Sequence, residues 1–199
     1  MNKVNLYFVD VRNLKEPNLD SFNLTKEQKQ IVNNLKIETA KIEKAVSFLL
    51  KRKFIGEYSL NEFGKPISRD KEFNVSHSKC YVAIAISDKP VGLDIEYLRP
   101  HKEALKKMIT SEKEEQAIES IEDFFKVWTS KESLVKCVGT GFKEDLKSIP
   151  ALPFNGIKKY KGKTYYSKSF KEDDLIVSIT LQDNAEFEVV KKKLDIEDL

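Results

Sequence analysis

The sequence is poor in cysteine and histidine, with two of each among 199 residues. Cys80 and Cys137 are too few for a disulfide framework, and neither stands at a metal-ligand spacing. The histidines, His77 and His101, are too few for a zinc or iron site built on imidazole. We therefore expect any metal here to bind carboxylate oxygen, which magnesium and manganese prefer.

Long apolar runs and a strong net charge are also missing. No run approaches the roughly 20 residues that a membrane span needs, and Asp10 and Arg12 interrupt the apolar N-terminus too early for a secretory signal. The net charge of +3 comes without a basic stripe interleaved with aromatics. We expect a cytoplasmic protein that binds neither membrane nor nucleic acid. Basic residues do gather between Lys26 and Lys53, where eight stand against three acidic ones.

The elements suggested by hydrophobic periodicity are mixed. Hydrophobic residues make up 40% and charged residues 34%, so the chain can form one ordinary domain or two small halves that share a core. Neither βαβ alternation nor a repeat of 20–50 residues is present, which favours an α+β fold. Helices are expected at Lys26–Arg52, Lys102–Met108, Ser111–Ser120 and Glu122–Val138, and strands at Leu6–Val11, Tyr81–Ile86, Val91–Glu96, Thr164–Phe170, Leu175–Leu181 and Phe187–Val190.

Two of these expectations are specific predictions about single elements. Apolar residues recur at helical spacings from Ile31 to Leu49, which predicts one continuous helix over Lys26–Arg52. The turn at Asp88-Lys89-Pro90 predicts that the strand Val91–Glu96 pairs back onto the buried strand before it.

Asp94 and Glu96 stand two apart on a predicted strand, so they share one face with Gly92. Two carboxylates that close repel each other unless a cation lies between them or water screens them. The same tripeptide recurs at Asp195-Ile196-Glu197, in an acidic tail where solvation is sufficient. Asp94-Ile95-Glu96 differs from this second copy because it lies in a predicted hairpin, where Gly92 on the same face leaves room above the strand.

In the helix Glu122–Val138, Glu132 and Lys136 lie one turn apart at the edge of the apolar face. Alone they indicate an ordinary helix salt bridge, worth about 0.3–0.5 kcal/mol. Together with Asp94 and Glu96 they supply three acidic donors and a lysine, which suffice to hold magnesium against a diphosphate. Lys131 falls inside the apolar stripe and must snorkel or find an acid, such as Asp94 or Glu96.

Two further segments can contact a ligand. In Phe73–Ser78, hydroxyls flank His77 and can bind phosphate oxygens, although a satisfied turn at a strand entrance fits equally well. A Ser-His catalytic pair is not expected, because neighbours on a strand point to opposite faces. Gly64-Lys65-Pro66 is a turn unless something binds it.

In this order the segments resemble the Sfp-type 4′-phosphopantetheinyl transferases, and the resemblance covers about residues 40–141. The matching segments are Gly64-Lys65-Pro66, Phe73–Ser78, Val91–Glu96 and Trp128–Ser133 with Lys136. Lys131, Glu132, Lys136 and Gly139-Thr140-Gly141 also resemble the smaller holo-acyl-carrier-protein synthases.

The resemblance implies a 4′-phosphopantetheinyl transferase-like fold of two similar halves related by a pseudo-twofold axis. Residues 1–89 would form the half with the coenzyme A-binding long helix, and residues 90–199 the half with the magnesium site and the catalytic helix. The implied reaction moves the phosphopantetheine arm of coenzyme A to a serine of an acyl or peptidyl carrier protein and releases adenosine 3′,5′-bisphosphate. A monomer would suffice.

The resemblance also implies roles for individual residues. Asp94, Glu96 and Glu132 would hold Mg²⁺ on the diphosphate, and Glu132 would take the serine proton. Lys136 would contact the diphosphate and stabilise the leaving phosphate. The remaining coenzyme A contacts would be Ser76 and His77 on phosphates, Gly64, Lys65 and Pro66 along the adenine, and Lys41 at the 3′-phosphate.

The sequence departs from the family at two places. Lys41 stands where the family often has arginine, which loses a bidentate grip on phosphate. Met108–Glu112 replaces a Phe-Phe-Ser/Thr run before a glutamate, so Glu112, Glu114 and Glu115 stay open for that acid. Two other functions stay open as well: a non-catalytic module that binds coenzyme A or a carrier, and a metal-dependent phosphohydrolase or nuclease.

Overall fold

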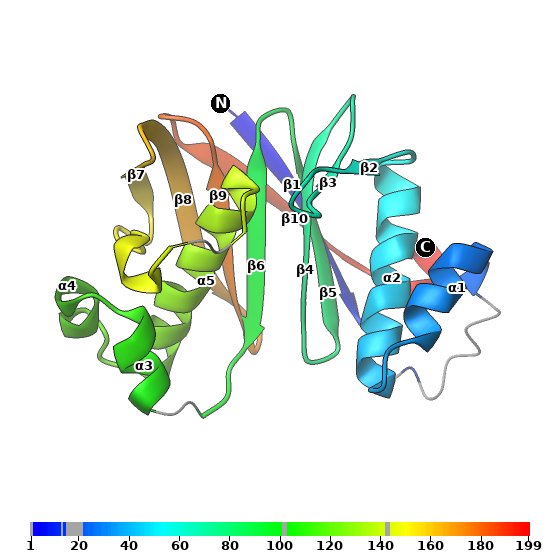
Figure 1. The fold of residues 1–199 in the computed structure, drawn as a ribbon, viewed down its shortest axis with the longest axis horizontal. Helices are drawn as coiled ribbons and strands as arrows, with labels where there is room; N and C mark the ends of the chain where they lie inside the picture. The colour runs from blue at the N-terminus through cyan, green and yellow to red at the C-terminus, as the bar shows by residue number, and fades with distance from the viewer. Residues whose placement is uncertain (1, 13, 15–21, 101–102, 142–143) are drawn as a thin grey trace.

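The computed structural model describes residues 2–12, 14, 22–100, 103–141 and 144–199, and shows an α+β fold with two four-stranded sheets (Figure 1). The first sheet holds β10 (Phe187–Leu194), β1 (Asn2–Asp10), β5 (Tyr81–Ser87) and β4 (Glu72–Ser78), in that order. The second holds β6 (Val91–Tyr97), β9 (Leu175–Leu181), β8 (Lys163–Glu172) and β7 (Gly156–Tyr160). A small hairpin joins β2 (Ser59–Leu60) to β3 (Pro66–Ile67), and the helices are α1 (Lys26–Asn33), α2 (Glu38–Phe54), α3 (Glu103–Ile109), α4 (Glu112–Gln116) and α5 (Ile121–Val138).

The two sheets share the central core, and the long helices cover their outer faces (Figure 1). Alternate residues of β1 and β5 meet alternate residues of β6 and β9 in one buried cluster, which includes Leu6, Ala83, Leu93 and Ile179. The layers therefore run helix, sheet, sheet, helix. No helix of the described residues is long and apolar enough to cross a membrane.

The predicted pairing of the strand at Val91–Glu96 is wrong. β5 pairs with β1 on one side and with β4 on the other, so both of its edges are used. β6 instead pairs antiparallel with β9 and begins the second sheet, with Asp94 opposite Ser178. The turn at Asp88-Lys89-Pro90 therefore leads from one sheet to the other.

The predicted continuous helix over Lys26–Arg52 is also wrong, because the chain breaks between α1 and α2. Asn34 caps the end of α1, and Ile37 is extended at the start of α2. Asparagine competes for backbone hydrogen bonds and favours helix ends, so Asn33-Asn34 stops the first helix. Ile31 is 46% exposed and lies outside the core, while α2 packs on the first sheet through Val46 and Leu50.

The two sheets repeat one strand order. In each, a first strand is followed by a long helix and then a hairpin, and the hairpin's second strand lies next to the first: β1-β5-β4 and β6-β9-β8. The C-terminal strand β10 returns to pair with β1 in parallel, so it adds to the sheet of the N-terminal half. The boundary at 89/90 and the pseudo-twofold axis stay predictions.

The predicted helix end at Gly139 is confirmed. Gly139 is left-handed with φ +80°, and its N–H donates to the carbonyl of Val135. Ser120 starts α5 with a capping box that includes Asp123. The predicted helix at Lys102–Met108 begins outside the described residues, and its described part is α3 from Glu103.

Candidate active site

A ladder of polar side chains joins the edges of the two sheets, where β4 lies beside β6. Alternate β4 residues point toward β6 and accept hydrogen bonds from its backbone N–H groups at 2.9–3.2 Å. The pairs are Asn74 with Leu93, Ser76 with Ile95, and Ser78 with Tyr97. Hydrogen bonds from the β6 backbone to β4 side chains thus take the place of backbone pairing between the two strands. They hold β6, which carries Asp94 and Glu96, beside β4.

Gly92 allows α5 to pack directly on this face of β6. A Cβ atom at Gly92 would lie 1.9 Å from the carbonyl oxygen of Ser133 and 2.4 Å from the nitrogen of Cys137. Only glycine permits this approach of helix to strand. It places Glu132 and Lys136 of α5 beside Asp94.

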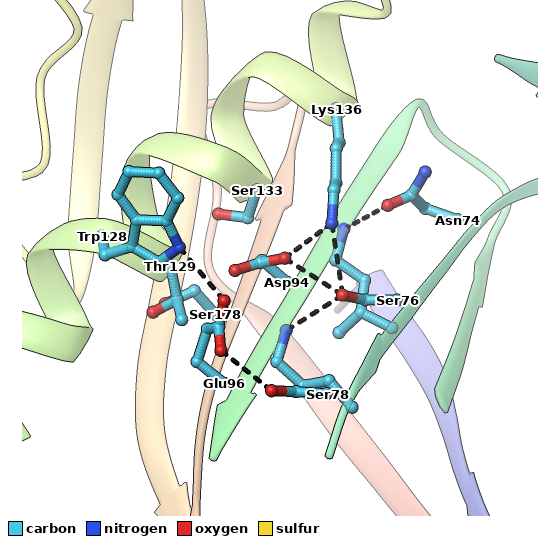
Figure 2. A network of polar contacts seen from close by, with 12 residues as sticks. Asn74, Ser76, Ser78, Asp94, Glu96, Trp128, Thr129, Ser133, Lys136 and Ser178 are labelled. Carbon is cyan, nitrogen blue, oxygen red and sulfur yellow. Dashed lines mark hydrogen bonds and ion pairs between the residues drawn. The ribbon is translucent and has the colours of Figure 1, made fainter. Parts of the chain in front are cut away.

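Asp94 is the buried centre of the site, 5% exposed (Figure 2). Its Oδ1 accepts from Lys136 Nζ at 2.6 Å and from Ser76 Oγ at 3.0 Å, and Lys136 Nζ also lies 3.2 Å from Ser76 Oγ. Burial raises the pKa of Asp94 despite the Lys136 ammonium, and the charge of Glu96 raises it further. Its Oδ2 is buried without a hydrogen-bond partner among the described residues.

Glu96 is engaged on both oxygens. Oε2 accepts from Ser78 Oγ at 2.8 Å and from Arg99 Nη1 at 2.7 Å, while Oε1 accepts from the Trp128 indole at 3.3 Å (Figure 2). These contacts hold Glu96 between the β4 edge and α5. They also connect Trp128 of α5 to the carboxylate face of β6.

Glu132 is half-buried on α5 and makes no hydrogen bond or ion pair within the described part of the chain. Burial raises its pKa to about 7; the charges of Asp94 and Glu96 add to the increase, and Lys136 opposes it. Such a carboxylate is poised to exchange a proton near neutral pH.

The charge of Glu96 raises the pKa of both Asp94 and Glu132, but the three acids are not gathered as a metal cluster. No group of three or more His, Cys, Asp or Glu side chains that could hold a metal ion occurs within residues 2–12, 14, 22–100, 103–141 and 144–199. Two donors nevertheless fit a hard divalent cation: the unpartnered, buried Oδ2 of Asp94 and the unpaired carboxylate of Glu132. An added positive charge would offset the burial, and the neighbouring negative charges, that raise both pKa values.

A pocket of about 220 Å³ opens beside these groups. Its lining includes Glu132 and Lys136 together with the turn Gly64-Lys65-Pro66 of the β2–β3 hairpin. The hairpin is held there by Lys65, whose Nζ donates to the Cys137 carbonyl at 3.1 Å, and by Asn61, whose side chain donates to the Gly139 carbonyl at 3.3 Å. Burial lowers the pKa of Lys65. The structure therefore brings this turn to the end of α5.

Ser76, His77 and Lys41 do not lie together. Ser76 faces Asp94, whereas His77, 52% exposed in its side chain, faces α2 on the other side of β4 and pairs with Glu43 at 3.1 Å. Glu43 also accepts from the backbone of Cys80; these two bonds lower its pKa although burial raises it. Lys41 forms an ion pair with Glu38 on α2. The roles of His77 and Lys41 stay predictions.

The predicted partner of Lys131 is wrong: its acid is Glu114, not Asp94 or Glu96. Lys131 is fully buried and pairs with Glu114 at 2.8 Å, and it also donates to the carbonyls of Leu146 and Ile149. Of the three glutamates left open by the sequence, Glu114 is therefore the one that supports α5. Lys158 of β7 is buried in the same region and donates to Ser130 of α5.

Sequence reasoning missed several residues around the site. Asn74, Arg99 and Glu43 were given no partner or role in it, Ser78 was expected to bind phosphate and not Glu96, and Glu114 was one of three open candidates. The alternation Asn74-Ser76-Ser78 was the available signal, because polar residues at strand spacing mark one face of β4. The two glutamates carried no such signal, since their partners are far away in the sequence.

Comparison with known proteins agrees with this geometry. Residues 90–183 match the family model of the 4′-phosphopantetheinyl transferase superfamily. The chain is 39% identical over 88 residues to the 4′-phosphopantetheinyl transferase gsp of Aneurinibacillus migulanus, covering 41% of this chain and 37% of that protein. It is 33% identical over 101 residues to the 4′-phosphopantetheinyl transferase Sfp of Bacillus subtilis (strain 168), covering 46% of this chain and 45% of that protein. Each alignment thus spans less than half of the relative's length, and the resemblance to the Sfp-type enzymes is confirmed.

Proposed function

We propose, from the match of residues 90–183 to the family model of the 4′-phosphopantetheinyl transferase superfamily, that this protein transfers the phosphopantetheine arm of coenzyme A to a serine hydroxyl of an acyl or peptidyl carrier protein. One observation carries the proposal. Glu132 and Lys136 line a pocket together with the Gly64-Lys65-Pro66 turn, and Lys136 pairs with the buried Asp94. A buried acid, a carboxyl with a pKa near neutrality and an ammonium are the groups that this transfer requires.

In the proposed reaction, the carrier serine attacks the phosphorus that bears the phosphopantetheine arm, and adenosine 3′,5′-bisphosphate leaves. Glu132 accepts the serine proton on a carboxylate oxygen, for which a pKa of about 7 is well matched. Lys136 Nζ stabilises the negative charge that grows on the leaving phosphate. Ser76, beside Lys136, keeps that ammonium oriented toward the pocket.

Magnesium is the metal that suits this site, since all of the candidate ligands are carboxylate oxygens. Asp94, Glu96 and Glu132 would hold it, and Asp94 Oδ2 and the Glu132 carboxylate are the donors among them that have no other partner in the described chain. When bound, it would neutralise charge on the diphosphate.

Coenzyme A would extend from Lys136 and Asp94 to residues of both the N-terminal and the C-terminal half of the chain. Gly64, Lys65 and Pro66 would line the adenine, and Lys136 and Ser76 would contact the diphosphate. His77 and Lys41 lie on the α2 side of β4 and would bind the 3′-phosphate region. Arg99 and the basic excess over Lys26–Lys53 give a charge suited to an acidic carrier. One copy of the chain supplies all of these groups.

The direct test is mass spectrometry of several apo carrier proteins after incubation with coenzyme A, Mg²⁺ and this protein. The expected result is a phosphopantetheine adduct on one serine, which Glu132→Gln abolishes and Glu115→Gln, at a half-buried residue of α4, leaves intact. Hydrolysis of coenzyme A without a carrier would instead favour a phosphohydrolase. Binding of coenzyme A without any adduct would favour a non-catalytic module.

A further inference from the structure

A second pocket, of about 150 Å³, lies away from the candidate active site and shares none of the residues that line the first. It forms where the ends of β1, β5 and β10 meet the turn between β8 and β9. Phe8, Leu175 and Leu194 give it an apolar lining that continues into the core. The volume is about five times the roughly 30 Å³ that a water molecule occupies in the liquid, so it fits about five to seven heavy atoms.

Tyr81 lines this pocket with an unsatisfied hydroxyl. The residue is 5% exposed, and its Oη is buried without a hydrogen-bond partner among the described residues. Burial raises the pKa of Tyr81, as do the nearby charges of Asp10, Asp174 and Asp173. The Arg12 guanidinium, 4.9 Å from the centre of the Tyr81 ring, opposes this increase in pKa. A buried hydroxyl without a partner is costly, and a bound ligand with a polar group would satisfy it.

The surroundings of the pocket are acidic. Three of the carboxylates are neutralised by ion pairs: Asp10 with Arg12, Glu172 with Lys191, and Asp173 with Lys193. Asp195, which lines the pocket, and Asp174 beside it make no ion pair in the described chain. Negative charge thus exceeds positive charge at the opening, which disfavours an anion and favours a cation.

We propose that this pocket binds a small organic cation, a linear primary amine or diamine of about four carbons. Its ammonium would pair with Asp195 at the opening, its methylenes would pack on Phe8 and Leu175, and its second polar end would hydrogen-bond Tyr81 Oη. A bare metal ion is disfavoured, because three of the nearby carboxylates are already in ion pairs and no group of three or more acids that could hold a metal ion occurs within the described residues. This proposal does not depend on the proposed transferase function.

The test is calorimetric titration of the full chain with 1,4-diaminobutane at fixed pH and ionic strength, with the neutral isostere 1,4-butanediol as the control ligand. Tyr81→Phe removes only the unsatisfied hydroxyl, so the fold is expected to persist. Asp195→Asn removes the unpaired charge at the surface without changing the core. Tyr58→Phe removes a tyrosine hydroxyl from the α2 side of the first sheet and serves as the matched variant.

Saturable binding of the diamine but not of the diol, weakened about ten-fold by Tyr81→Phe and by Asp195→Asn but unchanged by Tyr58→Phe, is the expected result. Absence of saturable binding would overturn the proposal. So would an affinity for the diol equal to that for the diamine, or wild-type affinity for the diamine in both pocket variants. If Tyr81→Phe does not fold, Asp195→Asn alone decides. Carrier modification should be unchanged in Asp195→Asn, which separates this site from the transferase site.

Discussion

Lys136 of α5 and Asp94 of β6 form an ion pair of 2.6 Å, and the other oxygen of Asp94 has no partner in the described chain. The ammonium therefore satisfies half of a buried carboxylate that the proposed reaction also needs for a divalent cation. In this arrangement Lys136 and the metal are competitors for the charge of Asp94. Coenzyme A would resolve the competition, because its diphosphate gives Lys136 another partner.

Lys136→Met should therefore bind Mg²⁺ more tightly than the wild type in the absence of coenzyme A. Removing a charged hydrogen bond to Asp94 should improve the dissociation constant by about ten-fold. Mg²⁺ titration by calorimetry measures this, with Lys126→Met on the same helix as the control. Transfer to a carrier should fall in Lys136→Met even at saturating Mg²⁺. Equal or weaker Mg²⁺ binding in this variant would show that the lysine does not compete.

Glu132→Gln should stabilise the fold at pH 8 and leave it unchanged at pH 4. The folded-state pKa of about 7 lies above the ordinary value of 4.5, so ionisation of Glu132 opposes folding as the pH rises through this interval. Glutamine has no charge to lose, and Glu132 has no hydrogen bond in the described chain to break. Urea unfolding at both pH values gives the comparison. A variant that is less stable than the wild type at pH 8 would contradict the electrostatic picture.

Lys158→Met should stabilise the protein more at pH 6 than at pH 10. Burial lowers the pKa of Lys158 to about 7 from 10.5; Glu114 opposes the decrease and Lys131 adds to it. Between these values the unfolded chain holds a proton that the folded chain lacks, so the wild type gains stability as the pH rises from 7 to 10.5. Methionine removes that dependence. Lys159→Met, on the exposed side of the same strand, should keep the wild-type pH profile in urea unfolding.

Gly92→Ala should lower the free energy of unfolding by about 3 kcal/mol or more, because its Cβ atom would overlap the backbone of α5 at Ser133 and Cys137. Gly162→Ala meets open space and carries only the strain of a left-handed φ of +73°, about 1–2 kcal/mol. Thermal and urea unfolding of the two variants test the difference. Similar losses would mean that α5 can move away from β6 at little cost.

The local signals in the sequence were reliable where a single element decides the outcome. The helix that ends at Gly139, the strand spacing of Asp94 and Glu96, and the opposite faces of Ser76 and His77 follow from backbone geometry over a few residues. Hydrophobic periodicity predicted one helix across Asn33-Asn34, but these residues end α1 although the apolar repeat continues beyond them.

The sequence by itself determined the parts of the site: its carboxylates, its lysine and the glycine that lets a helix approach a strand. Only the tertiary structure decided which of these groups meet. The first sheet uses both edges of β5, so β6 had to join β9, and side chains of β4 became the partners of its free edge. Lys131 and Glu114 pair for a similar reason, because burial demands a partner that no sequence spacing specifies.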